Sequence, residues 1–173
     1  MTKEEFSQIY YQEIDKVFRF FFLRVEMLEE AQDLTSLLFL KFYEFFLDDK
    51  NNQKEKKIKD KKAFLFRMAK NLLVDFYRRK NKNPFSLNQL FEEKGLDIET
   101  PSNLETKIEL NWELEKIKKA LKEINSLYAE VIIWHYVNDL SIKEIASILK
   151  KKENNVRVLL HRALEALKQQ LNK

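Results

Sequence analysis

Apolar residues recur at steps of three and four along most of this chain, which is the spacing that places them on one face of an α-helix. In the first half, this spacing predicts helices over residues 4–25, 29–47 and 61–80, with a lysine-rich polar loop at 48–62 before the third. A chain that keeps a helical period so consistently, and that has few turn-forming residues, is expected to be all-α.

The helix predicted at 61–80 has two different faces. Its apolar stripe is expected to face a core and consists of Leu65, Met68, Ala69, Leu72, Leu73 and Phe76. The opposite face carries Arg67, Lys70, Asn71, Val74 and Arg78, with Tyr77 and Arg79 beside them. Cations on such a face can hold phosphates while an amide and an aromatic ring reach bases. An ordinary amphipathic helix with a soluble basic face explains the same pattern.

Four consecutive apolar residues, Phe20, Phe21, Phe22 and Leu23, stand out in the first predicted helix. At about 100° per residue they spread around nearly the whole helix, so one packed face cannot bury all four. Two interpretations stay open. Either this helix is central, or part of it faces a partner.

Phenylalanine divides the chain in two. All 14 Phe lie at or before Phe91, and nine of them lie in residues 1–47, which two separate cores would explain. Residues 83–103 contain both prolines and the single glycine, a composition that is typical of a linker. We therefore expect two small helical domains, at 1–82 and 104–173, joined by this linker.

Composition excludes several classes of function. A single glycine cannot supply a phosphate-cradling loop, and the lack of cysteine removes disulfides, thiolate zinc sites and cysteine nucleophiles. His135 and His161 have no third ligand near them in the sequence, so neither a metal nor another cofactor is expected. The chain contains no apolar run of membrane-spanning length and does not begin like a signal peptide, so we expect a cytoplasmic protein without membrane insertion.

The net charge of +4 hides an uneven distribution. It is −4 over residues 1–47, +8 over 48–82, −6 over 83–115 and +6 over 116–173. Local clusters of Lys and Arg dominate binding to polyanions, so two basic blocks indicate two contact surfaces for nucleic acid. Two solvated lysine-rich helices would give the same distribution.

Residues 140–163 have the pattern of a helix-turn-helix. A capping box of Ser141 and Glu144 starts a short helix, a turn follows at 150–153, and a second helix is predicted from about 154 to 170. Apolar positions of this second helix point inward and leave Asn and Arg outside; they are Val156, Leu160, Ala163 and Leu167. Such a recognition helix lies in the major groove, where Asn pairs with adenine and Arg with guanine. The alternative is a generic helical hairpin.

Three motifs lie in a fixed order along the chain. The first is carried by Glu30, Ala31, Gln32, Asp33, Leu34, Phe39 and Tyr43, and the second by Phe64, Leu65, Met68, Ala69, Asn71, Asp75 and Arg78. The third is carried by Leu140, Ser141, Glu144, Ile145, Ala146, Leu149, Val156, Arg157, Leu160, Arg162 and Ala163. In this order they resemble regions 2.2, 2.3 to 2.4 and 4 of bacterial RNA polymerase sigma factors, in the extracytoplasmic-function (ECF) type of the sigma-70 family.

The resemblance implies a dissociable subunit that binds core RNA polymerase and directs promoter recognition and transcription initiation. Region 2.2 would bind the clamp helices of the largest subunit, through Asp33, Leu34, Ser36, Leu37, Phe39, Leu40 and Tyr43. The flap region of the polymerase is a further expected contact, and an anti-sigma factor is a further partner that the resemblance suggests. Capture of a flipped base in a pocket offsets the free-energy cost of unstacking it, so melting of promoter DNA needs no covalent chemistry. No catalytic residue and no enzyme activity are therefore expected.

Each promoter element would have its own surface. Region 2.3 to 2.4 would hold the melted −10 element through Lys62, Arg67, Lys70, Asn71, Asp75, Tyr77, Arg78 and Arg79. Region 4 would read the −35 element through Lys151, Lys152, Asn154, Asn155, Arg157, Val158, His161 and Arg162. A regulator that binds DNA without polymerase, with an N-terminal helical interaction domain, is the alternative function.

The chain departs from the family pattern at three places. Ser36-Leu37 replaces the usual Gln-Glu, which favours a more apolar polymerase contact. Lys150 stands where the turn usually has Gly; a non-glycine residue in the left-handed region costs about 1–2 kcal/mol, so we expect a differently shaped turn. Leu159 replaces a frequent Arg, and the neighbouring lysines could compensate.

Overall fold

A computed structural model of the chain describes residues 1–47, 58–82 and 112–172. The linker expected at 83–103 and most of the loop expected at 48–62 lie outside the described residues. In chain order the elements are α1 (Lys3–Phe22), α2 (Leu28–Leu47), α4 (Lys61–Lys82), α6 (Trp112–Glu123), α7 (Ser126–Ile132), the π-helical turn η3 (Ile133–Val137), α8 (Ile142–Leu149) and α9 (Glu153–Leu171). These segments contain helices and no strand, which confirms the all-α prediction.

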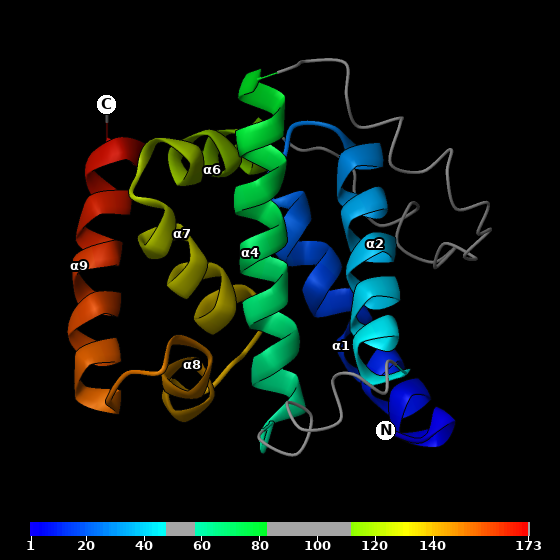
Figure 1. Cartoon of the computed structure of the whole chain (residues 1–173). Helices are drawn as coiled ribbons and strands as arrows, with labels where there is room; N and C mark the ends of the chain where they lie inside the picture. The colour runs from blue at the N-terminus through cyan, green and yellow to red at the C-terminus, as the bar shows by residue number, and fades with distance from the viewer. Residues whose placement is uncertain (48–57, 83–111, 173) are drawn as a thin grey trace.

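Helix α4 stands in the middle of the molecule (Figure 1). Helices α1 and α2 lie on one side of it and pack on each other, while α6 to α9 lie on the other side. Helix α4 contacts α1 and α2, with which it forms the N-terminal unit (the described residues up to 82). It also contacts α8 of the C-terminal unit (residues 112–172) and so joins the two units. No helix in the described ranges is long and apolar enough to cross a membrane.

Local signals explain where two of the helices begin. The side chain of Thr2 accepts a hydrogen bond from the backbone N–H of Glu5, and the Glu5 carboxylate accepts one from the Thr2 N–H, so a capping box starts α1. Ser141 and Glu144 form the same arrangement at α8, as predicted. These caps satisfy N–H groups that have no partner within the helix.

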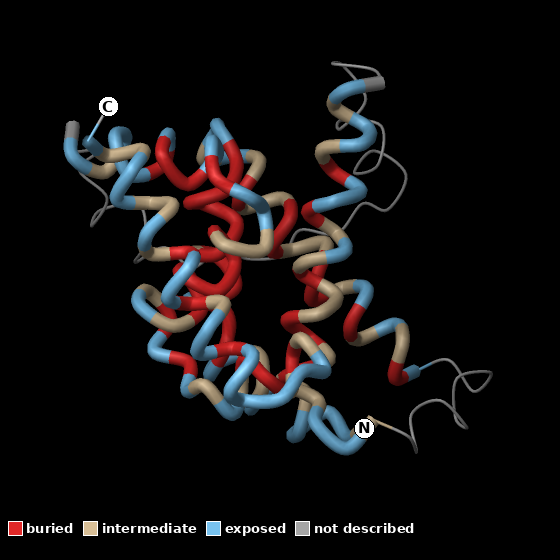
Figure 2. Tube along the Cα trace, turned by 90° about the vertical axis from the view of Figure 1, so that its left-hand side faces the viewer, coloured by how far each residue is buried: buried red, intermediate tan, exposed pale blue. Residues whose placement is uncertain are grey.

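The apolar run at the end of α1 is completely buried. Phe20, Phe21, Phe22 and Leu23 are each at most 6% exposed. Figure 2 shows the buried stretches of the chain, in red, gathered between the helices. The ring of Phe20 stacks on Trp134 of the C-terminal unit at a centroid distance of 5.8 Å, and the centroid of the Phe22 ring lies 4.3 Å from the ammonium group of Lys118. Helix α1 is therefore central, and part of its surface is covered by the second half of the same chain.

The buried side chains form one continuous core rather than the two separate cores that the phenylalanine distribution suggested. Trp134 is fully buried between the two units, where it stacks on Phe20 and meets the Phe66 ring edge-on. Phe66 comes from α4, so α4 buries a second face besides its predicted stripe. The pattern within the N-terminal half could not show this, because the covering residues lie far away in the sequence.

A buried amide closes the same contact. Asn138 is 1% exposed, donates through Nδ2 to the Lys16 carbonyl at 2.9 Å and accepts from Nε of Arg19 at 3.2 Å. Both partners belong to α1. The C-terminal unit therefore covers aromatic rings of that helix and also supplies hydrogen-bond partners to two of its polar groups.

Candidate nucleic-acid interface

The helix-turn-helix is present at the predicted positions, with α8 and α9 joined by a short turn at 150–152. In α8, Ile145, Ala146 and Ile148 are buried; in α9, Val156, Leu160 and Ala163 are buried. The predicted inward position Leu167 is half-buried. These side chains hold the two helices together and fix which face of α9 points outward.

Lys150 occupies the left-handed region, with φ 53° and ψ 43°. Its N–H donates to the Ser147 carbonyl at 3.4 Å, and the N–H of Lys151 donates to the Ala146 carbonyl at 3.0 Å, which are the two hydrogen bonds of a Schellman motif. The expectation of a differently shaped turn was therefore wrong. Lys150 adopts the left-handed conformation that glycine usually has in this turn, despite the steric clash of its Cβ.

All eight residues predicted for the −35 element are exposed on the turn and on α9: Lys151, Lys152, Asn154, Asn155, Arg157, Val158, His161 and Arg162. Lys143, Lys151, Lys152 and Arg157 also border one groove between α8 and α9. Arg157 donates to the carboxylate of Glu153 at 3.2 Å and to the amide oxygen of Asn154 at 2.8 Å. Both are exposed i+3 or i+4 contacts of a kind that contributes little to stability, so Arg157 can exchange them for a phosphate or a base.

The residues predicted for the −10 element fall into two groups. Asn71, Asp75, Arg78 and Arg79 are exposed on α4, and Asp75 and Arg78 form an ion pair at 3.5 Å. These four side chains are available to a ligand. The remaining four are half-buried, and each of them already has a partner inside the protein.

Tyr77 is one of the half-buried group. Its phenol donates a hydrogen bond to the backbone carbonyl of Arg24, and burial raises the pKa of Tyr77, with the charges of Arg24 and Lys80 opposing that rise. The ring therefore stays neutral. It holds the segment after α1 against α4 in this conformation.

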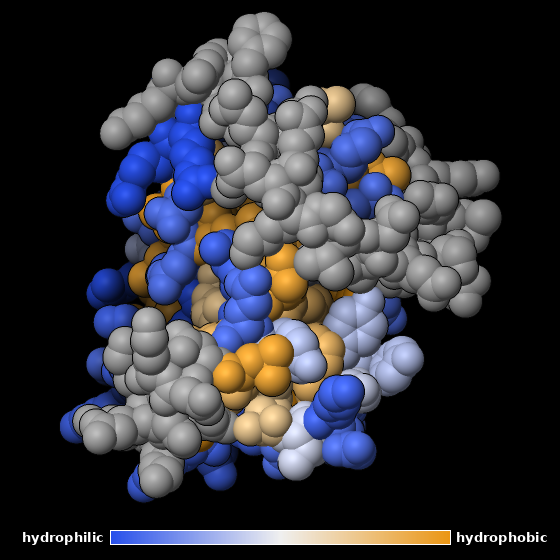
Figure 3. Space-filling view, turned by 45° about the vertical axis from the view of Figure 1, so that its right-hand side comes forward, coloured by the Kyte–Doolittle hydropathy of each residue, from blue (hydrophilic) through white to orange (hydrophobic). Residues whose placement is uncertain are grey.

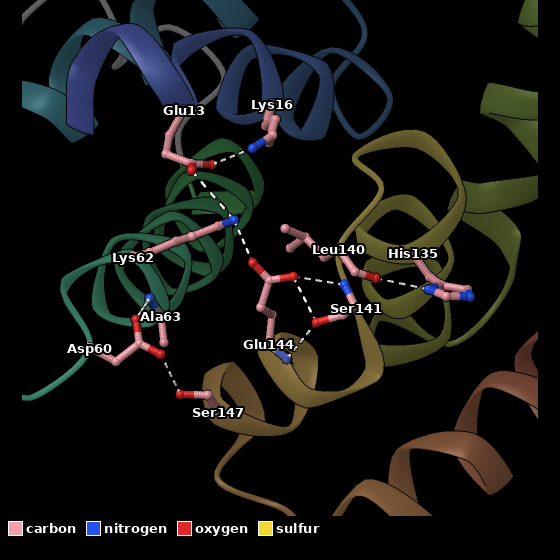
Figure 4. A network of polar contacts seen from close by, with 10 residues as sticks. All are labelled: Glu13, Lys16, Asp60, Lys62, Ala63, His135, Leu140, Ser141, Glu144 and Ser147. Atoms are coloured by element: carbon pink, nitrogen blue, oxygen red, sulfur yellow. Dashed lines mark hydrogen bonds and ion pairs between the residues drawn. The ribbon is translucent and has the colours of Figure 1, made fainter. Parts of the chain in front are cut away.

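Lys62, Arg67 and Lys70 complete the half-buried group, and all three meet acceptors from the C-terminal unit. The ammonium group of Lys62 lies 2.6 Å from the Glu144 carboxylate and 3.4 Å from that of Glu13 (Figure 4). Arg67 donates to the backbone carbonyl of Ser147 at 3.4 Å. These contacts connect the start of α4 to α8.

The third cation, Lys70, pairs with the almost fully buried carboxylate of Glu130 at 3.0 Å. The other oxygen of Glu130 accepts from the Ser126 hydroxyl at 3.2 Å, which in turn accepts from Nη2 of Arg24 at 2.9 Å. Burial lowers the pKa of Arg24, and the neighbouring Tyr77 and Glu130 counteract this. A chain of polar groups that includes the buried Arg24 and Glu130 therefore joins α4 and the segment after α1 to α7.

Glu144 is both a helix cap and an ion-pair partner. Partial burial disfavours its charge, but hydrogen bonds from Lys62 and from the Ser141 backbone and hydroxyl lower its pKa to about 2. The sequence indicated the cap, because capping is local. It did not indicate the ion pair, because Lys62 is 82 positions away, and Glu130 and Ser147 lack any local signal for the same reason.

The residues predicted for polymerase binding lie on α2. Asp33, Ser36, Leu37, Leu40 and Tyr43 are half-buried and therefore reach the surface. On the side of the molecule that Figure 3 turns to the viewer, hydrophobic residues gather in the middle and hydrophilic residues flank them. Burial raises the pKa of Asp33, and the neighbouring Glu29 and Glu30 raise it further.

Two members of the same predicted set lie in the core instead. Leu34 is 1% exposed and Phe39 is 3% exposed, and Phe39 meets the ring of Tyr10 of α1 edge-on at 4.8 Å. In this conformation they can support a docking surface but cannot themselves contact a partner. Their motif positions coincide with the apolar stripe that packs α2 on α1.

The described residues contain no group of three or more potential metal ligands. His135 is half-buried and its Nδ1 lies 2.8 Å from the Leu140 carbonyl, so it has a structural partner, while His161 is exposed on α9. The side chain of Trp134 lies in the core.

Sequence comparison identifies the C-terminal unit. Residues 114–167 match the family model described as "Sigma-70, region 4". This range runs from the first turn of α6 into the last turns of α9, so it contains α8, the turn, most of α9 and all eight residues predicted for the −35 element.

Relatives of similar length extend the likeness to the whole chain. The chain is 25% identical to the ECF RNA polymerase sigma factor SigW of Bacillus subtilis (strain 168) over 165 residues, which cover 91% of this chain and 83% of SigW. It is 26% identical to the RNA polymerase sigma factor YlaC of the same organism over 170 residues, which cover 98% of this chain and 92% of YlaC.

A solved structure has the same fold. The sigma factor RpoE from Bartonella quintana, crystallised in complex with the anti-sigma factor NepR, matches over 98% of both chains with a TM-score of 0.60 and 20% identity. The fold therefore agrees along the whole length, and the region 4 match and the full-length relatives agree on the family. Along its whole length the chain is thus similar to RNA polymerase sigma factors, among them one of the extracytoplasmic-function type, and its C-terminal unit matches sigma-70 region 4.

Proposed function

We propose that this protein binds core RNA polymerase and directs transcription initiation at promoters that carry its −10 and −35 elements. The observation that carries the proposal is α9, a helix within the region 4 match, whose predicted reading residues are all exposed. Asn and Arg there can hydrogen-bond base edges in a major groove, while Lys151 and Lys152 can hold phosphates.

In this proposal, Asn71, Arg78 and Arg79 of α4 contact the melted −10 strand, and the half-buried side chains of α2 contact the polymerase clamp. Polymerase supplies the chemistry, so this chain acts by binding alone, in the bacterial cytoplasm where polymerase and chromosome are. The solved relative is bound to an anti-sigma factor, and we propose that a partner of this kind also restrains the present chain.

The test is transcription from a pool of upstream DNA fragments, with core polymerase of the host and with or without this chain. We expect co-elution with core and new transcripts whose start sites share a −35/−10 pair. If the chain instead footprints duplex DNA by itself and never co-elutes with core, it is a polymerase-independent regulator and the proposal is wrong.

The two promoter surfaces can be separated in the same assay. The double substitution Asn71→Ala/Arg78→Ala should reduce permanganate reactivity at the −10 element and leave co-elution with core unchanged, because both side chains are exposed on the α4 face and not on α2. Loss of both signals together would indicate misfolding rather than a defect in promoter melting.

A further inference from the structure

One apolar side chain stands in the middle of the proposed −35 face of α9. Among the described residues of this helix, Val158 is the one large apolar side chain that is exposed, at 52%. Its surface neighbours one turn before and one turn after it are all exposed and all polar or charged: Asn154, Asn155, His161 and Arg162. Val158 is therefore not the margin of an apolar stripe.

The packing of α9 does not need Val158. The helix is held on its neighbours through Val156, Leu160 and Ala163, and at about 100° per residue Val158 stands almost opposite to them. Helix α9 lies at the edge of the molecule and packs on α6, α7 and α8 from one side (Figure 1). Valine is also a weaker helix former than Ala or Lys. Neither the core nor the helix itself explains an apolar residue at this position.

A DNA major groove offers one apolar group to such a side chain. Among the base edges there, only thymine carries a methyl group, at C5, while the other groups are hydrogen-bond donors and acceptors. A valine in a helix is stiff about χ1, so its two methyl groups keep one direction and lose little freedom on contact. Contact between the valine and a thymine methyl removes apolar surface of both molecules from water, which favours binding.

We propose that Val158 reads a thymine in the −35 element through the C5 methyl group of that base. This inference rests on the proposed function and names the base chemistry that one residue of the −35 face selects. Asn154 and Arg162 lie one helical turn, about 6 Å, to either side of Val158, so their contacts fall within about two base pairs of this thymine. Val158 thus contributes to specificity, whereas Lys151 and Lys152 hold phosphates that every sequence has.

The first test removes the methyl group from the DNA and leaves the protein unchanged. Promoters recovered in the transcription assay are rebuilt as fluorescein-labelled duplexes in which each −35 thymine, on either strand, is replaced by deoxyuridine, one at a time. Deoxyuridine keeps every hydrogen-bonding group of thymine and lacks only the methyl group. We expect core polymerase with the wild-type chain to bind one of these duplexes about fourfold more weakly, which is the worth of one buried methyl group.

The second test identifies the protein side of the contact. With Val158→Ala, the same replacement of thymine by deoxyuridine should no longer change the affinity, because the coupling vanishes when one partner of a contact is already missing. Val158→Thr keeps one of the two methyl groups and should keep part of the difference. The matched control is Ile117→Ala, which removes another exposed apolar side chain of the C-terminal unit, on α6, and should preserve the full difference.

The third test restores the methyl group on another base. A C·G pair with 5-methylcytosine at the same position presents a methyl group where thymine has one. The wild-type chain should therefore bind this duplex about fourfold more tightly than the duplex with unmodified cytosine. Val158→Ala should bind the two duplexes equally.

The outcomes separate this inference from the proposed function. If the chain neither co-elutes with core polymerase nor directs transcription, the proposed function is wrong. If transcription is directed but no −35 thymine responds to deoxyuridine, the proposed function stands and the role of Val158 is overturned. The same holds if Val158→Ala weakens binding and keeps the full difference between thymine and deoxyuridine, because the valine would then contact polymerase or the sugar-phosphate backbone. A difference that disappears in Val158→Ala and persists in Ile117→Ala supports the thymine contact.

Discussion

Lys150 shows how a single residue keeps a turn that its side chain disfavours. Its φ of 53° places Cβ close to the following carbonyl, a cost of about 1–2 kcal/mol that glycine does not have. The two hydrogen bonds of the Schellman motif and the buried pairs between α8 and α9 hold the turn in place nonetheless. The sequence placed the turn correctly but not its shape, because the local preference was outweighed by the packing of both helices.

Replacing Lys150 by glycine should therefore stabilise the protein. We expect Lys150→Gly to raise the free energy of unfolding by about 1 kcal/mol, measured by urea denaturation followed by circular dichroism. The control is Lys150→Ala, which removes the same charge but keeps a Cβ in the left-handed region. Equal stability of the two variants would show that charge, and not backbone strain, limits this turn.

Glu144 should make stability depend on acid pH. Its folded-state pKa of about 2 lies below its usual value of 4.5, so the charged carboxylate stabilises the folded chain above pH 4.5. This contribution should decrease as the pH falls from 4.5 towards 2, where the group is protonated in the unfolded chain and half protonated in the folded chain. The facing charges are Lys62 and, through Lys62, Glu13.

The measurement is the free energy of unfolding of wild type and Glu144→Gln from about pH 7 down to about pH 2. We expect wild type to be more stable at neutral pH and the difference to become small at the acid end of this range. Within the range, two parallel curves would contradict the assignment. The carboxyl resonance of Glu144, followed by NMR, gives the same pKa independently.

At the scale of elements, α9 combines a packing face and a reading face. Val156, Leu160 and Ala163 recur at steps of four and three and fix the helix on its neighbours. The α9 residues between them are exposed for that reason, so the sequence sufficed to predict which side chains of α9 point outward. Helix α4 differs, because the same periodicity left its second buried face, that of Phe66, unrecognised.

Arg157→Ala/Arg162→Ala should weaken binding of duplex DNA that carries the −35 element. If each cation neutralises one phosphate, the slope of log K against log salt should fall by about 2, at ~0.9 per phosphate. Fluorescence anisotropy at several salt concentrations measures this slope. Lys168→Ala, an exposed cation near the other end of α9, is the control and should leave the slope unchanged. If the double variant keeps the wild-type slope, α9 meets DNA through another face.

At the scale of the whole molecule, two units that the sequence separated share one core. The helix boundaries that were predicted follow from local spacing and caps: α1, α2, α4, α8 and α9 begin and end within three residues of the predicted positions, whereas no bounds were predicted for α6 and α7. Which units touch could not be predicted, because it depends on pairs such as Lys62 with Glu144 and Arg67 with Ser147, which are 82 and 80 positions apart. The run from Phe20 to Leu23 was the one local sign, since so many apolar residues need cover on more than one side.

Trp134 should therefore stabilise both halves at once. Trp134→Ala removes a fully buried ring that packs on Phe20 and Phe66, and truncations of this kind cost about 3–5 kcal/mol. In differential scanning calorimetry we expect one transition for wild type, because the core is continuous, and two separated transitions at lower temperature for the variant. Tyr136→Ala, in the same π-helical turn but 52% exposed, should change stability by less than about 0.5 kcal/mol. If Trp134→Ala instead unfolds in a single transition close to that of wild type, the Trp134 ring does not couple the two units.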